Sequence, residues 1–338
     1  MSAADVISAM RAFLPFASSE AEAIVRDTSS STLAATLETL KLREDQIAEV
    51  VGHWDEFRGD EEWVSLLGAC LTMLEVDRGS YDAPLPIWPD LDDADPCGRL
   101  FYFYLFAVDY PRALAFLERS ATPPRIIDAT MEVLSRHAAT HERKWGTLGV
   151  DAGWWMLPIL RGEILQIGVL KFHRLTLGVG SLSPSPWLSD DEAAARGPGF
   201  RRGDALIGLH IPQGADLSPA ALDLTFTDAR RVLGNLWPVE ERRIATCQSW
   251  MMDERLGDYL DDETNLVSFQ RRFTIMPLWR DDDDDVLDFV FRCPGVALAD
   301  LPRTTRLERA IVEVLQRGEH WHSPVGWLDF DGVRPRAR

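Results

Sequence analysis

Two short stretches hold most of the residues whose types suit catalysis. His210 lies near the end of the apolar run 205–211, and Cys247 and Ser249 alternate with their neighbours in the run 243–249. An imidazole titrates near neutral pH and suits a general base, while a thiol or hydroxyl can be a nucleophile. No Gly-x-Ser-x-Gly sequence surrounds Ser249, so the serine lacks the elbow that exposes a hydrolase nucleophile.

One reaction that such residues can support is direct transfer of an acyl group from a thioester to an amine, which needs no protein nucleophile, only a polarised carbonyl, a proton acceptor and good placement. We therefore interpret Cys247 as a packing residue and Ser249 as a hydrogen-bond donor to the leaving thiol. His210 is the candidate base. The alternative for His210 is a half-buried histidine bonded to a loop carbonyl, and His173 lies on a separate predicted strand.

The elements around these residues form a strand–turn–helix–strand–helix series. Strands are predicted at 205–211 and 243–249 and expected to be neighbours, with short helices near 254–260 and 265–273. A helix opens at Ser218-Pro219, where a serine cap precedes a proline at the first helical position. Amides at such a helix start can bind phosphate, although most capped helices bind nothing.

The candidate cofactor-binding residues lie on the turn and the first helical turn after the first of these strands. Asp216 has the wrong charge for a phosphate loop, so it must point away from a bound phosphate. The residues are Ile211, Gln213, Gly214, Ser218 and Ala220.

Three segments carry a resemblance to a known family. They read Gly208-Leu209-His210-Ile211-Pro212, Cys247-Gln248-Ser249-Trp250-Met251-Met252-Asp253 and Asn265-Leu266-Val267-Ser268-Phe269-Gln270. These segments are similar to sequences of a bacterial family of acyltransferases, which are built from a helical N-acyltransferase N-terminal domain and a GNAT-like C-terminal domain. The resemblance covers most of the chain.

The resemblance implies an α+β protein that moves an acyl group from a thioester donor to an acceptor, with the carrier held between the two strands. Other GNAT enzymes carry Gln/Arg-x-x-Gly-x-Gly/Ala, whereas Gln213-Gly214-Ala215-Asp216-Leu217 has one glycine. Coenzyme A, as acyl-CoA, is the favoured donor, and an acyl-carrier protein is the alternative. Positions carried over from the family, without assigned roles, are His210, Ser249, Trp250, Asp253, Asn265 and Gln270.

We therefore predict an N-acyltransferase that acts on a small-molecule amine by direct transfer. Two alternatives stay open: a non-catalytic GNAT-like binding protein, and a thioesterase-like hydrolase that uses Ser249 or Cys247. Asn265 could cap the helix that follows it, whereas Gln270 has no evident structural role.

Composition limits the partners. The net charge of -19 argues against nucleic acid and against a polybasic membrane contact, and favours an amine-bearing substrate through electrostatic steering. No membrane-spanning run or signal peptide is predicted, so we expect a cytoplasmic protein.

The cysteines and histidines do not predict a metal site. The four cysteines are scattered without CxxC spacing. His137 and His141 read as a surface pair, and His320-Trp321-His322 is an equally weak signal. The arginine pairs at 201–202, 230–231, 242–243 and 271–272 can contact phosphate, but solvated edges or structural ion pairs are the favoured interpretation.

Two domains are predicted, 1–146 and 147–338. Residues 81–96 and 181–203 are rich in turn formers and predict loops, the five aspartates at 281–285 predict a turn, and the aromatic run 100–106 favours a buried helix over a strand. Apolar spacing predicts helices at 4–13, 19–27, 30–40, 43–54, 61–74, 99–108, 112–119 and 124–144. Further on it predicts helices at 158–167 and 304–317, and strands at 169–177, 286–291 and 325–330.

Overall fold

The chain forms two compact units, Met1–Leu165 and Gln166–Arg338. The computed structural model describes residues 8, 14, 16–81, 91, 96–180, 182–237, 243–276 and 279–332. The division between the units falls after Leu165, later in the chain than the boundary expected at 146/147. The difference arises because the short helices η1 (Gly153–Met156) and α10 (Leu157–Leu160) belong to the first unit. Most of the helix expected at 4–13, and most of the loop expected at 81–96, lies outside the described residues.

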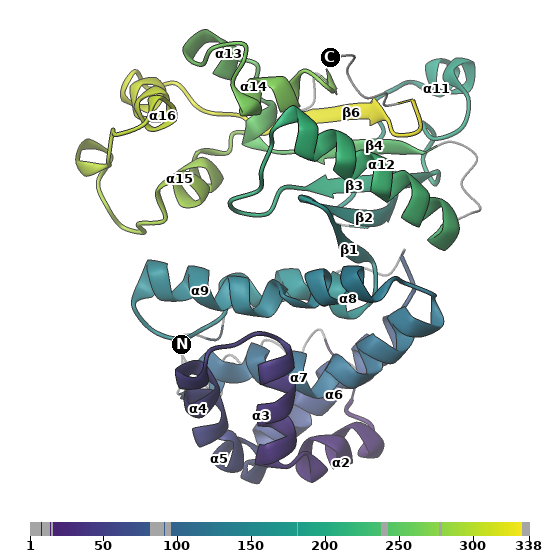
Figure 1. Ribbon diagram of the computed structural model, residues 1–338, viewed down its shortest axis with the longest axis vertical. Coiled ribbons are helices and arrows are strands. Elements are labelled where there is room, and N and C mark those ends of the chain that lie inside the picture. Colours follow the sequence, from purple (N-terminus) through teal and green to yellow (C-terminus); the bar gives the residue numbers. More distant parts are fainter. Residues whose placement is uncertain are drawn as a thin grey trace. The chain divides into compact units, whose positions relative to one another are not determined.

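The first unit is helical, as predicted (Figure 1). The aromatic run 100–106 lies inside one long helix and is fully buried, with Tyr104 packed against Trp54 and Phe57. The helices are α2 (Ser19–Asp27), α3 (Ser30–Thr39), α4 (Glu44–Gly52), α5 (Trp54–Gly59), α6 (Glu61–Asp77), α7 (Pro96–Arg119), α8 (Pro124–Met131) and α9 (Val133–Trp145).

Helix α7 joins two predicted helices into one, with Pro111 inside it. By length and composition alone α7 could cross a membrane, but it is mostly buried among its neighbours, as the core helix of a folded unit is. An interior proline removes one helical hydrogen bond and commonly bends or ends a helix, but α7 continues through Pro111 to Arg119.

The second unit is built on a six-stranded mixed sheet in the order β1-β2-β3-β4-β6-β5. The predicted strands at 169–177, 205–211, 243–249 and 325–330 are all present, and β3 and β4 are adjacent and parallel, as expected. The strands are β1 (Ile164–Ile167), β2 (Leu170–Thr176), β3 (Ala205–His210), β4 (Ile244–Gln248), β5 (Thr274–Ile275) and β6 (Val325–Asp329).

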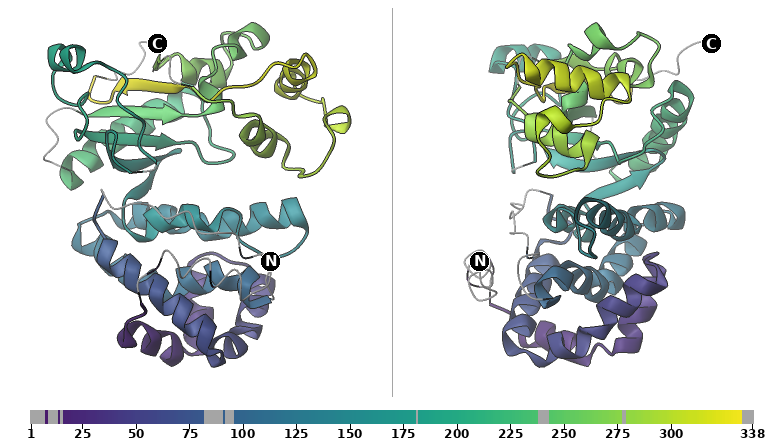
Figure 2. Two further views of the ribbon diagram at one scale, coloured as in Figure 1. Left: turned by 180° about the vertical axis from the view of Figure 1, so that it is seen from behind. Right: turned by 90° about the vertical axis from the view of Figure 1, so that its left-hand side faces the viewer.

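Helices cover both faces of this sheet (Figure 2). Helix α12 (Pro219–Leu236) lies across one face, where Phe226 contacts Phe172 of β2. The segment that contains α11 (Asp190–Arg196) covers the other, where Phe200 contacts Trp327 of β6. The remaining helices are η2 (Trp250–Met252), α13 (Leu256–Tyr259), α14 (Asn265–Gln270), α15 (Asp283–Phe291), η3 (Leu298–Asp300) and α16 (Arg306–Gln316).

Four predictions between residues 158 and 291 were wrong. The expected helix 158–167 breaks after α10, because Gly162 adopts a left-handed φ of 77° and the chain continues as β1. The expected loop 181–203 contains α11, which starts with a capping box between Ser189 and Glu192.

The third error is the strand expected at 286–291, which is helix α15. Asp283, Asp284 and Asp285 lie in its first turn, where carboxylates interact favourably with the helix dipole. Its apolar residues recur at helical spacing and pack on a core formed with α13 and α16: Val286, Leu287, Val290 and Phe291. The fourth error is the turn expected at 281–285, because these aspartates start a helix.

Candidate active site

Strands β3 and β4 part before they end. The last residues that pair between these two strands are Gly208 of β3 and Thr246 of β4. The pairing of β3 with β2 continues to His210, and the pairing of β4 with β6 continues to Gln248. The last residues of β3 and β4 therefore keep only their outer neighbours, which leaves main-chain groups facing an opening between two parallel strands.

One face of the sheet is polar beside this opening. Cross-strand pairing places Lys171 and His173 of β2, His210 of β3, and Thr246 and Gln248 of β4 on the same face. Lys171, His173 and Thr246 are buried, His210 is half-buried and Gln248 is exposed. The opposite face carries apolar residues under α12, so the polar groups gather on one side of the opening.

The two histidines contact each other. Nδ1 of His173 lies 3.2 Å from Nε2 of His210, with ring centroids 5.4 Å apart. Burial, followed by the nearby His173 and Lys171, holds the pKa of His210 well below its usual value. His210 is therefore neutral at pH 7, which is the form a general base requires.

The sequence predicts His173 on a strand separate from that of His210, but it does not predict that Lys171, His173 and Gln248 share one face with His210. Residues two apart on a strand point to the same face, so Lys171 and His173 share one face of β2, and Gly208 and His210 share one face of β3. The antiparallel pairing of β2 with β3 brings these two faces together. Strand pairing is not visible in one sequence, so only the alternation was available beforehand.

Ser249 and Cys247 have different surroundings from His210. Ser249 is half-buried in extended backbone directly after β4, and its Oγ accepts a hydrogen bond from Met251 N at 3.2 Å. This bond uses an oxygen lone pair and leaves the hydroxyl hydrogen to donate. Cys247 is buried, and burial raises the pKa of its thiol to about 12. The protonated Cys247 thiol is a poor nucleophile.

The turn after β3 forms as predicted. Ala215 N donates to Pro212 O at 3.1 Å, and Gly214 has a φ of 72°. A turn with a positive φ at its third residue requires glycine or a similarly tolerant residue, which explains Gly214 structurally. A side chain at Gly214 would meet open space, so the turn leaves room above it.

Helix α12 begins where Ser218 caps it, and Ser218 Oγ accepts from Ala221 N at 3.4 Å. Pro219 has no N–H, and Ala220 N precedes the first amide that bonds within the helix. Asp216 does not point away: its Oδ1 accepts from Ser218 N at 2.9 Å. That bond, with a further one to the Ser218 side chain, lowers the pKa of Asp216. Asp216 thus occupies an amide that a bound phosphate would take.

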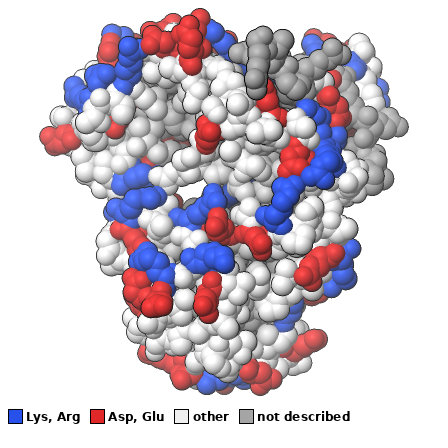
Figure 3. Space-filling model, in the orientation of Figure 1, with Lys and Arg blue, Asp and Glu red and all other residues white. Residues whose placement is uncertain are grey.

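Four members of the arginine pairs form ion pairs with acidic side chains. Arg272 lies beside the start of α12, 2.7 Å from Asp223 and 3.4 Å from Pro219 O. Arg231 pairs with Asp228 of the same helix at 2.5 Å. Basic and acidic groups lie side by side over this face of the second unit (Figure 3). Arg243 and Arg271 pair with Asp331 and Asp262.

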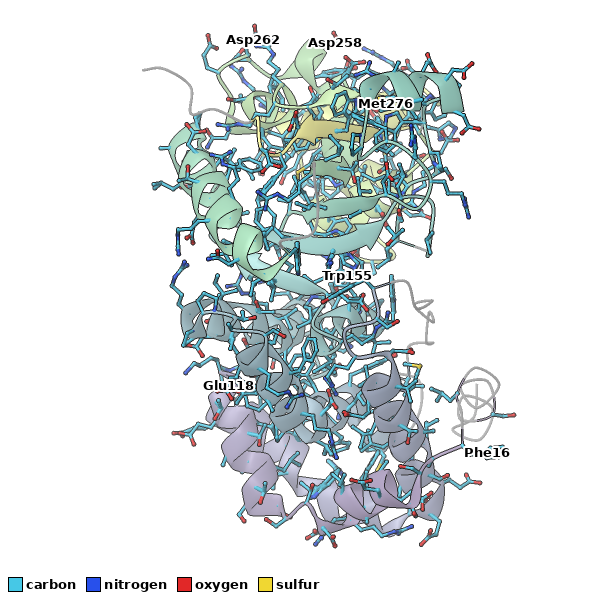
Figure 4. The ribbon with its side chains drawn as sticks, turned by 90° about the vertical axis from the view of Figure 1, so that its right-hand side faces the viewer. Phe16, Glu118, Trp155, Asp258, Asp262 and Met276 are labelled. Carbon is cyan, nitrogen blue, oxygen red and sulfur yellow. The ribbon has the colours of Figure 1, made fainter. Side chains whose placement is uncertain are left out.

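Several carried-over positions have structural roles. Thr264, not Asn265, caps α14, by accepting from Val267 N. Gln270 is buried and donates to the carbonyls of Met251 and Asp253, so it holds the chain after β4. Trp250 packs in the core with α15 and α16. Asp258 of α13 and Asp262 of the loop before α14 are exposed and point outward (Figure 4).

Within the described part of the chain, no three His, Cys, Asp or Glu side chains are grouped to hold a metal ion. His137 and His141 each contact a backbone carbonyl through Nδ1, at Asp151 and Thr147. His320 contacts Asp283 at 2.6 Å. These contacts give the three histidines structural partners.

Comparison with protein-family models identifies both units. Residues 31–162 match an N-acyltransferase N-terminal domain, and residues 164–328 match a GNAT-like C-terminal domain. The chain belongs to the acyltransferase family that joins these two domains, and it is an acyltransferase enzyme.

Solved structures agree with this assignment. The chain is 26% identical to an acyltransferase in complex with decanoyl-CoA, with a TM-score of 0.73 over 87% of this chain and 86% of that chain. It is 28% identical to an acyltransferase in complex with decanoyl-CoA and teicoplanin, with the same TM-score and coverage. An acyltransferase mutant in complex with octanoyl-CoA is 26% identical, with a TM-score of 0.75 over 89% and 88% of the two chains. No curated protein matches the chain.

Proposed function

We propose that this enzyme transfers an acyl group from acyl-CoA directly to an amine of a small-molecule acceptor. The observation that carries the proposal is the opening between β3 and β4 with a neutral His210 at its edge. Similar structures hold octanoyl-CoA and decanoyl-CoA. We therefore propose a donor acyl chain of comparable length.

The donor is proposed to lie between the ends of β3 and β4. There, main-chain groups of both strands can form hydrogen bonds with the amides of its pantetheine arm. Its pyrophosphate is proposed to lie near Gly214–Ala220, in contact with Ile211, Gln213, Gly214, Ser218 and Ala220. The helix start supplies partial positive charge and the Ala220 amide. Asp216 has to release Ser218 N when phosphate binds.

The proposed reaction is a single displacement. The amine nitrogen bonds to the thioester carbonyl carbon, the carbon–sulfur bond breaks, and the sulfur leaves as a thiolate. His210 takes the proton lost by the nitrogen, directly or through a water, and that proton finally reaches the sulfur. Backbone amides at the strand ends polarise the carbonyl, and Ser249 donates a hydrogen bond to the sulfur.

The acceptor is proposed to be an amine-bearing small molecule. The net charge of -19 attracts cations over a distance. One similar acyltransferase is bound to teicoplanin together with decanoyl-CoA, which makes teicoplanin a reasonable first probe. We place the reaction in the cytoplasm, in keeping with the four free cysteines.

Titration calorimetry with CoA and decanoyl-CoA, followed by assay of thiol release with teicoplanin and simple amines, tests this function. We expect donor binding and thiol release that depends on the amine and matches an N-acylated product. Thiol release without an amine would instead indicate a thioesterase. Absence of binding at millimolar donor would indicate an acyl-carrier protein donor or a non-catalytic protein, and a carrier loaded with the same acyl group separates these two.

A further inference from the structure

A second histidine supports His210, and the reaction proposed above does not use it. His173 on β2 pairs with Gly208, two residues before His210 on the neighbouring strand. Its Nδ1 lies 3.2 Å from Nε2 of His210, and its side chain is 1% exposed. A side chain buried to this degree acts on a substrate only through a neighbour.

We infer that His173 is a positioning residue: its Nδ1 holds Nε2 of His210, so that Nδ1 of His210 is the ring nitrogen that takes the proton of the acceptor amine. This inference rests on the proposed function, because it requires His210 to be the base. It adds the residue that fixes the tautomer and the orientation of that base.

The chemistry follows from the shared proton. A hydrogen bond between two imidazole nitrogens contains one hydrogen, donated either by His173 Nδ1 or by His210 Nε2. If His210 Nε2 donates, Nδ1 of the neutral His210 ring carries a lone pair and can accept a proton. If His173 donates, His210 carries its hydrogen on Nδ1 and cannot. The protonated His210 ring keeps its Nε2–H bond to His173, so the ring holds one orientation before and after it takes the proton.

The backbone is built to allow this contact. A Cβ at Gly208 would lie 3.3 Å from Cβ of His173, 3.6 Å from His210 Nε2 and 2.8 Å from Cδ1 of Leu175. Glycine therefore provides the space in which the two rings meet across the strands. The rings are tilted by 45°, so their contact is a directed hydrogen bond and not a stack.

Lys171 completes the arrangement, because it pairs directly with His210 on the same face and is 8% exposed. The groups that face His210 from β2 are Lys171 and His173, and those on the same face of β4 are the uncharged Thr246 and Gln248. After burial, His173 and Lys171 are the causes that lower the pKa of His210. A proton taken from the amine is thus readily released again.

Kinetics of three variants of β2 test the inference. His173→Phe keeps a ring but removes both nitrogens, and we expect kcat to fall by about 10–100-fold with KM for both substrates within about twofold. His173→Asn keeps an oxygen near the position of Nδ1 and should recover part of the loss. Phe172→Leu, on the opposite face of β2, is the packing control and should lower stability without changing the pH profile.

Lys171→Met should move the acid limb of the kcat profile to higher pH, while Lys171→Arg should leave it in place. Equal kcat in wild type and His173→Phe would overturn the inference. So would an acid limb that does not move in Lys171→Met.

Nitrogen-15 NMR of the histidine rings in the wild-type protein needs neither activity nor a stable variant. We expect His210 to be protonated on Nε2 and unprotonated on Nδ1 at pH 7. The reverse tautomer overturns the inference even if acyl transfer is observed. The expected tautomer in a protein without transferase activity would instead confirm the histidine arrangement and reject the proposed function.

Discussion

Two histidines of the second unit have pKa values shifted in opposite directions by their surroundings. His210 is half-buried beside His173 and Lys171, and its pKa lies well below the usual value because of burial and these neighbours. His320 is exposed, 2.6 Å from Asp283, and its hydrogen bond to that carboxylate, together with the charge of Asp283, raises its pKa. Its surroundings favour the neutral form of the first histidine, a proton acceptor, whereas the carboxylate of Asp283 favours the charged form of the second.

The comparison predicts that only one of these histidines matters for turnover. His210→Ala should lower kcat by about 10²–10⁴-fold, the usual contribution of a positioned general base. Donor affinity should stay nearly unchanged, because the pyrophosphate is proposed to bind elsewhere. His320→Ala is the matched control and should retain full activity. Steady-state rates together with calorimetric donor affinity check this, and a fully active His210→Ala would show that another residue is the base.

The same comparison predicts a pH profile. Because the pKa of His210 is lowered, the neutral base persists below the usual histidine value of about 6.5. Rates expressed per unprotonated acceptor amine should therefore stay level as pH falls through 6.5 and decline only at lower pH. An acid limb centred on 6.5 would mean that the titrating base is an ordinary exposed histidine. Measurement of kcat/KM from pH 4.5 to 8.5 distinguishes the two.

Asp216 gives a smaller effect, on binding alone. Asp216→Asn keeps an oxygen that can accept from Ser218 N but removes the negative charge beside the proposed pyrophosphate site. We expect CoA to bind roughly fivefold more tightly, equivalent to about 1 kcal/mol. Asp216→Ala also frees the amide and should bind at least as tightly. Weaker CoA binding in both variants would place the pyrophosphate away from Gly214–Ala220.

The smallest effect concerns stability, and its sign differs between the two histidines. His320 has a raised pKa when folded, so its pairing stabilises the protein fully below about pH 6.5 and loses this effect as pH rises through the folded pKa. His320→Gln should slightly lower the melting temperature at pH 5.5 and leave it unchanged at pH 8.5. His210 has a lowered pKa, so it destabilises the fold as pH falls below about 6.5.

Local patterns in the sequence predicted much of the fold. Apolar periodicity located the helices of the first unit, and alternation located β2, β3, β4 and β6. Serine followed by proline located the start of α12. The failures arose where two patterns competed: the aspartates at 281–285 indicate a turn by charge repulsion, but they also favour the start of α15. In the same way, Ser189 and Glu192 cap a helix inside a segment rich in turn formers.

The candidate site was only partly predictable, because it depends on contacts between strands. The sequence indicated His210 and the turn at Gly214, but not that His173 faces His210 or that β3 parts from β4 after Gly208. Gln270 lacked a structural role in the sequence and has one in the structure, where it donates to the carbonyls of Met251 and Asp253. Such partners become visible only when the chain is folded.

The central claim is that the acyl group passes directly from the donor to the amine at the mouth of β3 and β4. Intact-mass spectrometry of quenched reactions, with decanoyl-CoA alone and then with amine added, tests it most directly. We predict no change in protein mass with donor alone and acylated product only after the amine is added, with Cys247→Ala equally active. A protein adduct of one acyl group on Cys247 or Ser249, formed with donor alone and discharged by the amine, would contradict the account.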